Sequence, residues 1–191
     1  SFGTPAADPK NLGFVVNISG SAIGHPRSYL GEENYGNIAT QFSHHSVPDL
    51  GAYYQSNTFL NEAITLDALK ALEYPIQQKT PFFLYLSHYA VHLPIMSDSA
   101  FIKKYLDRGL DQEEANYASL VESMDSSLGQ VLDYLDEKKI AENTIVIFMS
   151  DNGGLGNEHP AGKATNHNNF PLKSGKGSVN EGGVREPMLI Y

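Results

Sequence analysis

A long amphipathic helix between two apolar runs is the feature that most constrains this fold. Across 111–139, apolar side chains recur at steps of three and four, with acidic residues at the start and lysines at the end. The flanking runs, PFFLYLSH (81–88) and TIVIFM (144–149), resemble buried strands. Strand, helix and strand form a right-handed crossover between parallel strands. The sequence therefore predicts an α/β fold, with a mostly parallel sheet flanked by helices and a helix over 113–138.

Two further elements are expected, one on each side of this unit. A helix should begin near Asn61 and end at Pro75. Its N-terminal cap would come from Asn57, Thr58 or Asn61. The run EPMLIY (186–191) should form another strand. The residues expected on the buried faces of the two helices are Ile64, Ala68, Ala71, Leu72, Ala118, Val121, Leu128, Val131, Leu132 and Leu135.

Residues 1–57 show neither helical nor strand periodicity and are rich in Gly, Asn, Ser and Tyr. Such a long irregular segment in a compact domain is usually functional or depends on neighbours elsewhere. We expect a single incomplete domain, loop-rich over 1–57 and α/β over 58–191. Because the chain begins without Met and stops inside a predicted strand, we expect it to be a piece of a longer domain.

Composition excludes several classes of function. The chain carries a formal net charge of −9, from 22 acidic and 13 basic residues, which argues against non-specific binding to nucleic acid or to an anionic membrane. No apolar run is long enough to span a bilayer. The absence of cysteine excludes disulfides and thiolate metal sites, and it leaves the redox compartment unidentified.

The run 144–149 ends in SDNGG (150–154), which has two interpretations. Asx side chains and glycines form good turns, so the segment could serve only to reverse the chain. Alternatively, Asp151 and Asn152 lie at the carboxyl end of a predicted central strand, where open α/β sheets place their ligands. Polar residues elsewhere in the chain have to decide between the two.

Two other segments place polar side chains on the same edge of the predicted sheet. His92 follows the first apolar run, and Lys176 lies between two glycines in a long loop over 152–185. Each has a structural alternative, as a histidine bonded within its own loop or as a solvated lysine in a turn. Glu181 and Arg185, in the same long loop, are expected to pair with each other and brace it.

These four side chains favour one kind of chemistry when they are taken together. Asp151 and Asn152 supply oxygen ligands, which suit Ca²⁺ or Mg²⁺ rather than Zn²⁺. His92 can donate a proton near neutral pH. Lys176 adds a fixed positive charge that its flanking glycines allow to approach closely. The combination predicts a site for a tetrahedral oxyanion ester, either a sulfate or a phosphate.

Three blocks of the chain resemble the type I sulfatases of the alkaline phosphatase superfamily. They are TPFFLYLSHYAVHLPI, NTIVIFMSDNGG and PLKSGKGSVNEGGVREPMLI, in the order and spacing of that family, with YASLVESMDSSLGQVLDYLDE on the helix between the first two. The resemblance runs from about Leu60 to Tyr191 and is weaker before it. The chain looks like the central part of a sulfatase catalytic domain.

The resemblance implies a role for each predicted site residue. Asp151 and Asn152 would help to bind a divalent cation, usually Ca²⁺, with Mg²⁺ as the alternative. His92 and Lys176 would contact the sulfate ester, and His92, helped by Lys176, would stabilise or protonate the leaving oxygen. The glycines after Asn152 would let the backbone bend tightly beside the ion.

Several parts of the family pattern have no counterpart in this chain. The family's nucleophile is a formylglycine made in a Cys- or Ser-x-Pro-x-Arg motif, and GHPRSY (24–29) does not fit that motif. The early Asp-Asp metal ligands, the Lys-Trp-His segment and the C-terminal subdomain are also missing. We therefore expect the isolated chain to be inactive and to need the remainder of its own protein to complete the site.

The leading hypothesis is a sulfuric ester hydrolase whose substrate is a sulfated small molecule or a sulfated glycan. One alternative is a phosphoester or phosphonate hydrolase, or a phosphoethanolamine transferase, of the same superfamily. Another is a non-catalytic module that binds sulfated glycans. The loops 1–57 and 155–170, where specificity normally lies, do not identify the substrate. The family resemblance suggests an exported protein, periplasmic, extracellular or lysosomal.

Overall fold

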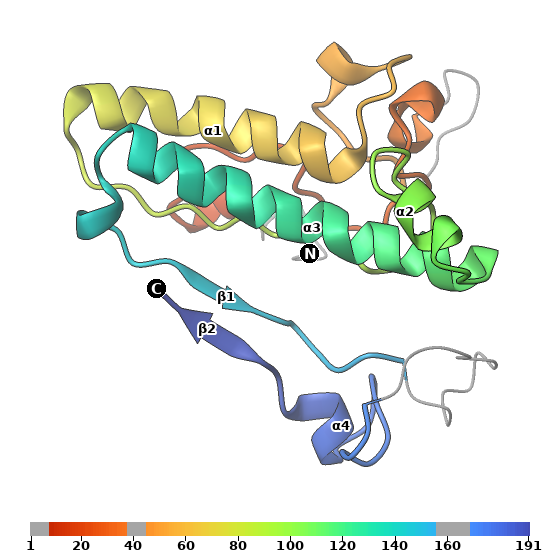
Figure 1. Ribbon diagram of the computed structural model, residues 1–191. Helices are drawn as coiled ribbons and strands as arrows, with labels where there is room; N and C mark the ends of the chain where they lie inside the picture. The colour runs from red at the N-terminus through yellow and green to blue at the C-terminus, as the bar shows by residue number, and fades with distance from the viewer. Residues whose placement is uncertain (1–7, 38–44, 156–168) are drawn as a thin grey trace. The chain divides into compact units, whose positions relative to one another are not determined.

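The computed structural model describes residues 8–37, 45–155 and 169–191 and divides the chain into two compact units, Ser1–Glu137 and Lys138–Tyr191. Each unit is described by itself (Figure 1). The first contains the helices α1 (Leu60–Gln78), α2 (Ile102–Asp107) and α3 (Gln112–Glu137), with the short 3-10 helices η2 (Pro9–Leu12), η3 (Gly31–Gly36) and η4 (Gly51–Tyr53). The second contains η5 (Ala141–Asn143), β1 (Ile147–Met149), α4 (Glu181–Val184) and β2 (Met188–Ile190).

The long helix predicted between the apolar runs is confirmed as α3. Asp111 Oδ1 accepts a hydrogen bond from the N–H of Glu114 at 2.9 Å and so caps the helix start. The buried residues of α3 that follow four-residue steps are Ala115, Ser119, Ser123, Ser127, Val131 and Leu135. The predicted apolar face is wrong in part, because Val121 is exposed. Small side chains replace large ones on this face, and α3 packs alongside α1 (Figure 1).

The helix predicted from near Asn61 to Pro75 is confirmed at its start, Leu60, but its expected cap and its expected end are wrong. The N-cap position of α1 is Phe59, which makes no side-chain cap, and Asn61 is buried inside the first turn. Pro75 lies within the helix, where it removes its own N–H hydrogen bond from the ladder without ending the helix. The helix ends at Gln78, and the left-handed φ of 54° at its C-cap, Lys79, lets the N–H of Thr80 reach the carbonyl oxygen of Pro75 at 3.0 Å.

The irregular N-terminal part of the chain supplies a large share of the core of the first unit. Tyr29, Tyr35, Val47 and Leu50 are fully buried and form one cluster with residues from the start of α1. The rings of Tyr29 and Phe59 stack with their centroids 5.5 Å apart. This segment therefore packs against α1 as loops and short 3-10 helices, which explains how it is held without longer regular elements.

A buried polar contact joins both long helices to the segment before His92. The Thr65 hydroxyl of α1 and the Ser127 hydroxyl of α3 are hydrogen-bonded, and Ser127 also bonds His88 Nε2 at 2.9 Å. Burial lowers the pKa of His88 to about 4, so this imidazole is neutral at pH 7. None of the helices among the described residues is long and apolar enough to cross a membrane.

The mostly parallel sheet predicted from the sequence is not found among the described residues. β1 pairs with β2 in an antiparallel, two-stranded sheet, with Ile147 opposite Ile190 and Met149 opposite Met188. The strands predicted over 144–149 and 186–191 therefore exist but are shorter than predicted. They run in opposite directions, so the sheet that they form is antiparallel rather than parallel. Both strands expose apolar side chains, Ile147 at 58% and Ile190 at 64%.

The strand predicted over 81–88 is also wrong for the described structure. This segment is not assigned to any strand, and Phe83 and Tyr85 are exposed rather than buried. A strand needs a neighbouring strand to take its backbone hydrogen bonds, and the described part of the chain pairs none with it. The segment still leads from α1 to His88 and then to His92.

Candidate active site

Asp151 and Asn152 follow β1 directly, as the sequence predicts, and they form a bend. The Ser150 hydroxyl donates a hydrogen bond to the carbonyl oxygen of Asn152 at 2.8 Å, which fixes the bend locally. Asp151 is exposed and Asn152 is half-buried. Asp151 is thus accessible to a ligand, which a metal site requires.

The glycine after this bend has a different role from the tight bend predicted for it. A Cβ atom on Gly153 would lie 1.8 Å from the carbonyl oxygen of Gly182, a distance that no real side chain tolerates. The N–H of Gly153 donates to the carbonyl of Gly183 at 3.2 Å. Close approach of two backbone segments, rather than a left-handed φ, requires glycine at this position.

The loop that carries Lys176 is attached to the chain just beyond Asn152. The N–H of Lys176 donates to the carbonyl oxygen of Gly154 at 2.8 Å. The side-chain amide of Asn169 donates to the same carbonyl and to that of Ser174, each at 3.0 Å. The structure therefore brings the Lys176 backbone to the segment that carries Asp151 and Asn152. Asn169 was not predicted, since an isolated asparagine carries no signal in the sequence.

The predicted pair between Glu181 and Arg185 is confirmed. The two charged groups lie 3.2 Å apart across α4, and both side chains are mostly exposed. An exposed pair of this kind contributes about 0–1 kcal/mol. The pair spans the short helix from which Gly182 and Gly183 contact Gly153.

His92 lies in the first unit, at a turn that follows the segment 81–88. Its N–H donates to the carbonyl of Tyr89 at 2.9 Å, and its own carbonyl accepts the Tyr29 hydroxyl at 3.0 Å. Nδ1 of His92 lies 3.4 Å from the carbonyl oxygen of Leu93.

Two histidines that the sequence did not single out stack with His92. The ring of His25 stacks with both of the others, with its centroid 4.0 Å from that of His45 and 5.1 Å from that of His92. The planes are nearly parallel, at 15° and 8°. The three histidines lie far apart in the sequence, so the sequence did not reveal the cluster. His25 belongs to GHPRSY, the segment that does not match the nucleophile motif.

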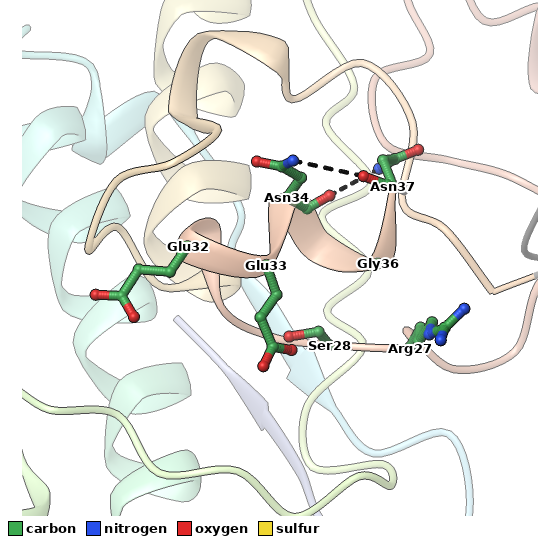
Figure 2. A pocket seen from close by; sticks show the side chains of 7 residues that line it. All are labelled: Arg27, Ser28, Glu32, Glu33, Asn34, Gly36 and Asn37. Carbon is green, nitrogen blue, oxygen red and sulfur yellow. Dashed lines mark hydrogen bonds between the residues drawn. The ribbon is translucent and has the colours of Figure 1, made fainter. Parts of the chain in front are cut away.

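A polar pocket of about 470 Å³ lies in the first unit (Figure 2). Arg27 and Glu32 line its opposite ends in this view, and the Asn37 amide donates to the Asn34 carbonyl at 2.9 Å. Arg27 connects the pocket with the histidines, because its N–H donates to the carbonyl of His45 at 2.8 Å. None of the predicted site residues lines this pocket.

The predicted site is divided between the two units. Asp151, Asn152 and Lys176 belong to the second unit, and one loop contact brings their backbones together. His92 belongs to the first unit. Convergence of His92 with the other three residues stays a prediction.

The residues present fit only part of a cation site. The side-chain oxygens of Asp151 and Asn152 have the right chemistry for Ca²⁺ or Mg²⁺, but calcium takes about six to eight oxygens. Within 8–37, 45–155 and 169–191, no group of three or more His, Cys, Asp or Glu side chains is placed to hold a metal ion. Further ligands would have to come from elsewhere, and the cation stays a prediction.

Comparison with known proteins identifies the class of protein that carries this site. The sulfatase family model matches residues 18–191, which is most of the chain. The chain therefore belongs to the sulfatase family, and the resemblance to the type I sulfatases is confirmed.

Individual relatives support this assignment. A sulfatase of Formosa agariphila is 39% identical over 122 residues, which cover 58% of this chain and 21% of that protein. Steryl-sulfatase of Homo sapiens is 33% identical over 132 residues, which cover 69% of this chain and 21% of that protein. The crystal structure of Ps i-CgsB in complex with k-i-k-neocarrahexaose matches with a TM-score of 0.75 at 27% identity, over 98% of this chain and 42% of that one. The chain thus spans about a fifth of the length of these two curated relatives.

Proposed function

We propose that this chain is part of a sulfuric ester hydrolase that cleaves sulfate monoesters. The observation that carries the proposal is the 2.8 Å hydrogen bond from the N–H of Lys176 to the carbonyl of Gly154. This bond attaches the loop of Lys176 to the segment that carries Asp151 and Asn152. A positively charged side chain and two side chains with oxygen ligands for a metal ion therefore lie on connected backbone segments. Such a set suits a tetrahedral, anionic ester.

Each residue has one role in the proposed reaction. Asp151 and Asn152 would hold a divalent cation, which, when bound, supplies positive charge beside the sulfate oxygens. Lys176 would offset the negative charge of the sulfate group as the bond between sulfur and the ester oxygen breaks. His92 would stabilise the leaving oxygen or give it a ring proton. The nucleophile would be a formylglycine that lies outside this chain, because no Cys- or Ser-x-Pro-x-Arg motif occurs in it.

The proposed substrate is a sulfated small molecule or a sulfated glycan. The name of one relative, steryl-sulfatase, refers to a sterol, and the matching crystal structure holds an oligosaccharide. Both kinds of ligand therefore occur among proteins similar to this one.

The test is hydrolysis of 4-nitrocatechol sulfate, a sulfated-sugar panel and a phenyl phosphate ester by the longer protein that contains this chain. His92→Ala and Lys176→Ala should each lower turnover by about 10²- to 10⁴-fold. Lys173→Ala removes an exposed lysine from the same loop and should leave turnover unchanged. Turnover of the phosphate ester alone, or a parent enzyme indifferent to both substitutions, would contradict the proposal. The chain by itself should be inactive.

A further inference from the structure

The loop over 169–180 carries Lys176 without a helix or strand of its own. Lys176 is half-buried, and within the described residues no ion pair holds its ammonium group. The place of that positive charge therefore depends on how the backbone of the loop is held. The contacts that hold this backbone decide whether the lysine can act on a substrate.

The side-chain amide of Asn169 joins two parts of this region. Its Nδ2 donates to the carbonyl oxygens of Gly154 and Ser174, each at 3.0 Å. The carbonyl of Gly154 also accepts the N–H of Lys176 at 2.8 Å. One carboxamide therefore connects the segment that follows β1 with the loop that leads to Lys176.

The two acceptors fix the direction in which this carboxamide faces. Backbone carbonyl oxygens can only accept hydrogen bonds, so the NH₂ group of Asn169 has to face them, and both of its protons are used. The carbonyl of Asn169 accepts the N–H of Leu172 at 2.8 Å, which holds the residue itself. An aspartate here would have nearly the same shape but would set a negative oxygen against two carbonyl oxygens.

Ser174 is the point at which the loop most needs such a contact. Its φ of 65° is left-handed, a conformation that glycine adopts readily and other residues do not. Its carbonyl oxygen lies so close to Gly182 that a Cβ added there would be 2.2 Å from it. A residue in a strained conformation persists where its surroundings over-determine it. The bond from Asn169 thus holds the backbone two residues before Lys176.

We propose that Asn169 is a positioning residue for Lys176 in the hydrolysis of the sulfate ester. This role rests on the proposed function, in which Lys176 offsets the negative charge of the sulfate group. Asn169 acts through the lysine rather than by contact with the substrate. Electrostatic stabilisation of a transition state requires charges that are already in place, so a loosened loop should slow the chemical step more than it weakens substrate binding.

The first experiment measures kcat and KM for a sulfate ester with the longer protein that contains this chain. Asn169→Asp and Asn169→Leu both remove the NH₂ donors, and the leucine variant does so without adding a charge. Each should lower kcat about 10- to 100-fold and change KM by less than about threefold. Asn57→Asp makes the same chemical change at an exposed position of the first unit and should leave both constants unchanged.

A double-mutant cycle tests whether Asn169 acts through Lys176. When Lys176→Ala is already present, the Asn169 substitutions should lower kcat by no more than about twofold, because the charge that they misplace is gone. A merely structural role would instead lower kcat by the same factor with and without the lysine. Additive losses in the cycle would therefore overturn the proposal.

Hydrogen exchange over residues 172–178 provides a measurement that does not depend on activity, and both Asn169 variants should exchange faster there than the unchanged protein. Circular dichroism separates a loosened loop from lost folding, and Asn169→Ser serves if neither variant folds. Unchanged kcat or unchanged exchange in the folded variants would overturn the positioning role and leave the sulfatase function intact. Turnover that is indifferent to Lys176→Ala would instead reject the role proposed for the lysine, and the role of Asn169 with it.

Discussion

The hydroxyl of Tyr29 donates a hydrogen bond to the backbone carbonyl of His92 at 3.0 Å, although the two residues are 63 positions apart. Tyr29 is fully buried, and its burial raises the pKa of the phenol, with a further contribution from Tyr89. The phenol therefore stays protonated and remains a donor over the working pH range. A core residue thus positions the backbone of a predicted catalytic residue.

Tyr29→Phe should lower the free energy of unfolding by about 1–3 kcal/mol, because it leaves a partly buried carbonyl without its donor. The change should also move the NMR signals of the His92 ring, since the backbone of that residue loses its anchor. Tyr74→Phe is the matched control, because Tyr74 is 72% exposed and should change stability by less than about 0.5 kcal/mol. Urea unfolding of the three proteins measures the difference. Equal stabilities would mean that the bond contributes nothing.

Acid should destabilise the first unit through His88. Burial lowers its pKa from 6.5 in the unfolded chain to about 4 in the folded one, so the unfolded state binds more protons between these values. The stability due to the neutral imidazole is complete above pH 6.5 and falls as the pH drops toward 4. The total loss is on the order of 3 kcal/mol.

The measurement for His88 is urea unfolding at several pH values in the unchanged chain and in His88→Gln. Glutamine can still bond the Ser127 hydroxyl but does not titrate. The variant should therefore lose less stability than the unchanged chain when the pH falls from about 7 to about 4.5. Parallel curves for the two proteins would show that His88 does not carry this dependence.

Gly153→Ala should disrupt the second unit, because the added methyl would overlap the carbonyl oxygen of Gly182. We expect loss of protection of the Lys176 amide in hydrogen exchange and a destabilisation of at least about 2 kcal/mol. Gly129→Ala is the matched control, since nothing lies within 4 Å of its added methyl group on α3. That substitution should stabilise the chain by about 0.5–1 kcal/mol. Normal amide protection in Gly153→Ala would refute the close-approach argument.

The chain should bind calcium weakly, since Asp151 and Asn152 supply only part of a coordination shell. Tight calcium sites use six to eight oxygens, several of them charged, so we expect a dissociation constant of about 1 mM or weaker. Isothermal titration calorimetry on the chain and on Asp151→Ala measures it. Micromolar affinity that Asp151→Ala abolishes would show that the site is complete without further ligands.

The sequence by itself determined the elements whose signals are local. Four-residue periodicity and an acidic start identified α3, because both the cap at Asp111 and the dipole act within one turn. The pair Glu181–Arg185 was predictable for the same reason, since residues four apart lie on one helix face. The bend at Asp151 and Asn152 followed from residue types that favour turns.

Only the tertiary structure decided the features that join distant segments. The stack of His25, His45 and His92 leaves no periodic pattern, because its members come from three loops. The antiparallel pairing of β1 with β2 was missed because an apolar run predicts a strand but not the direction of its neighbour. The requirement for glycine at position 153 is explained only by its contact with Gly182. Local propensity acts over a few residues, whereas close backbone approach and ring stacking depend on which distant segments the fold brings together.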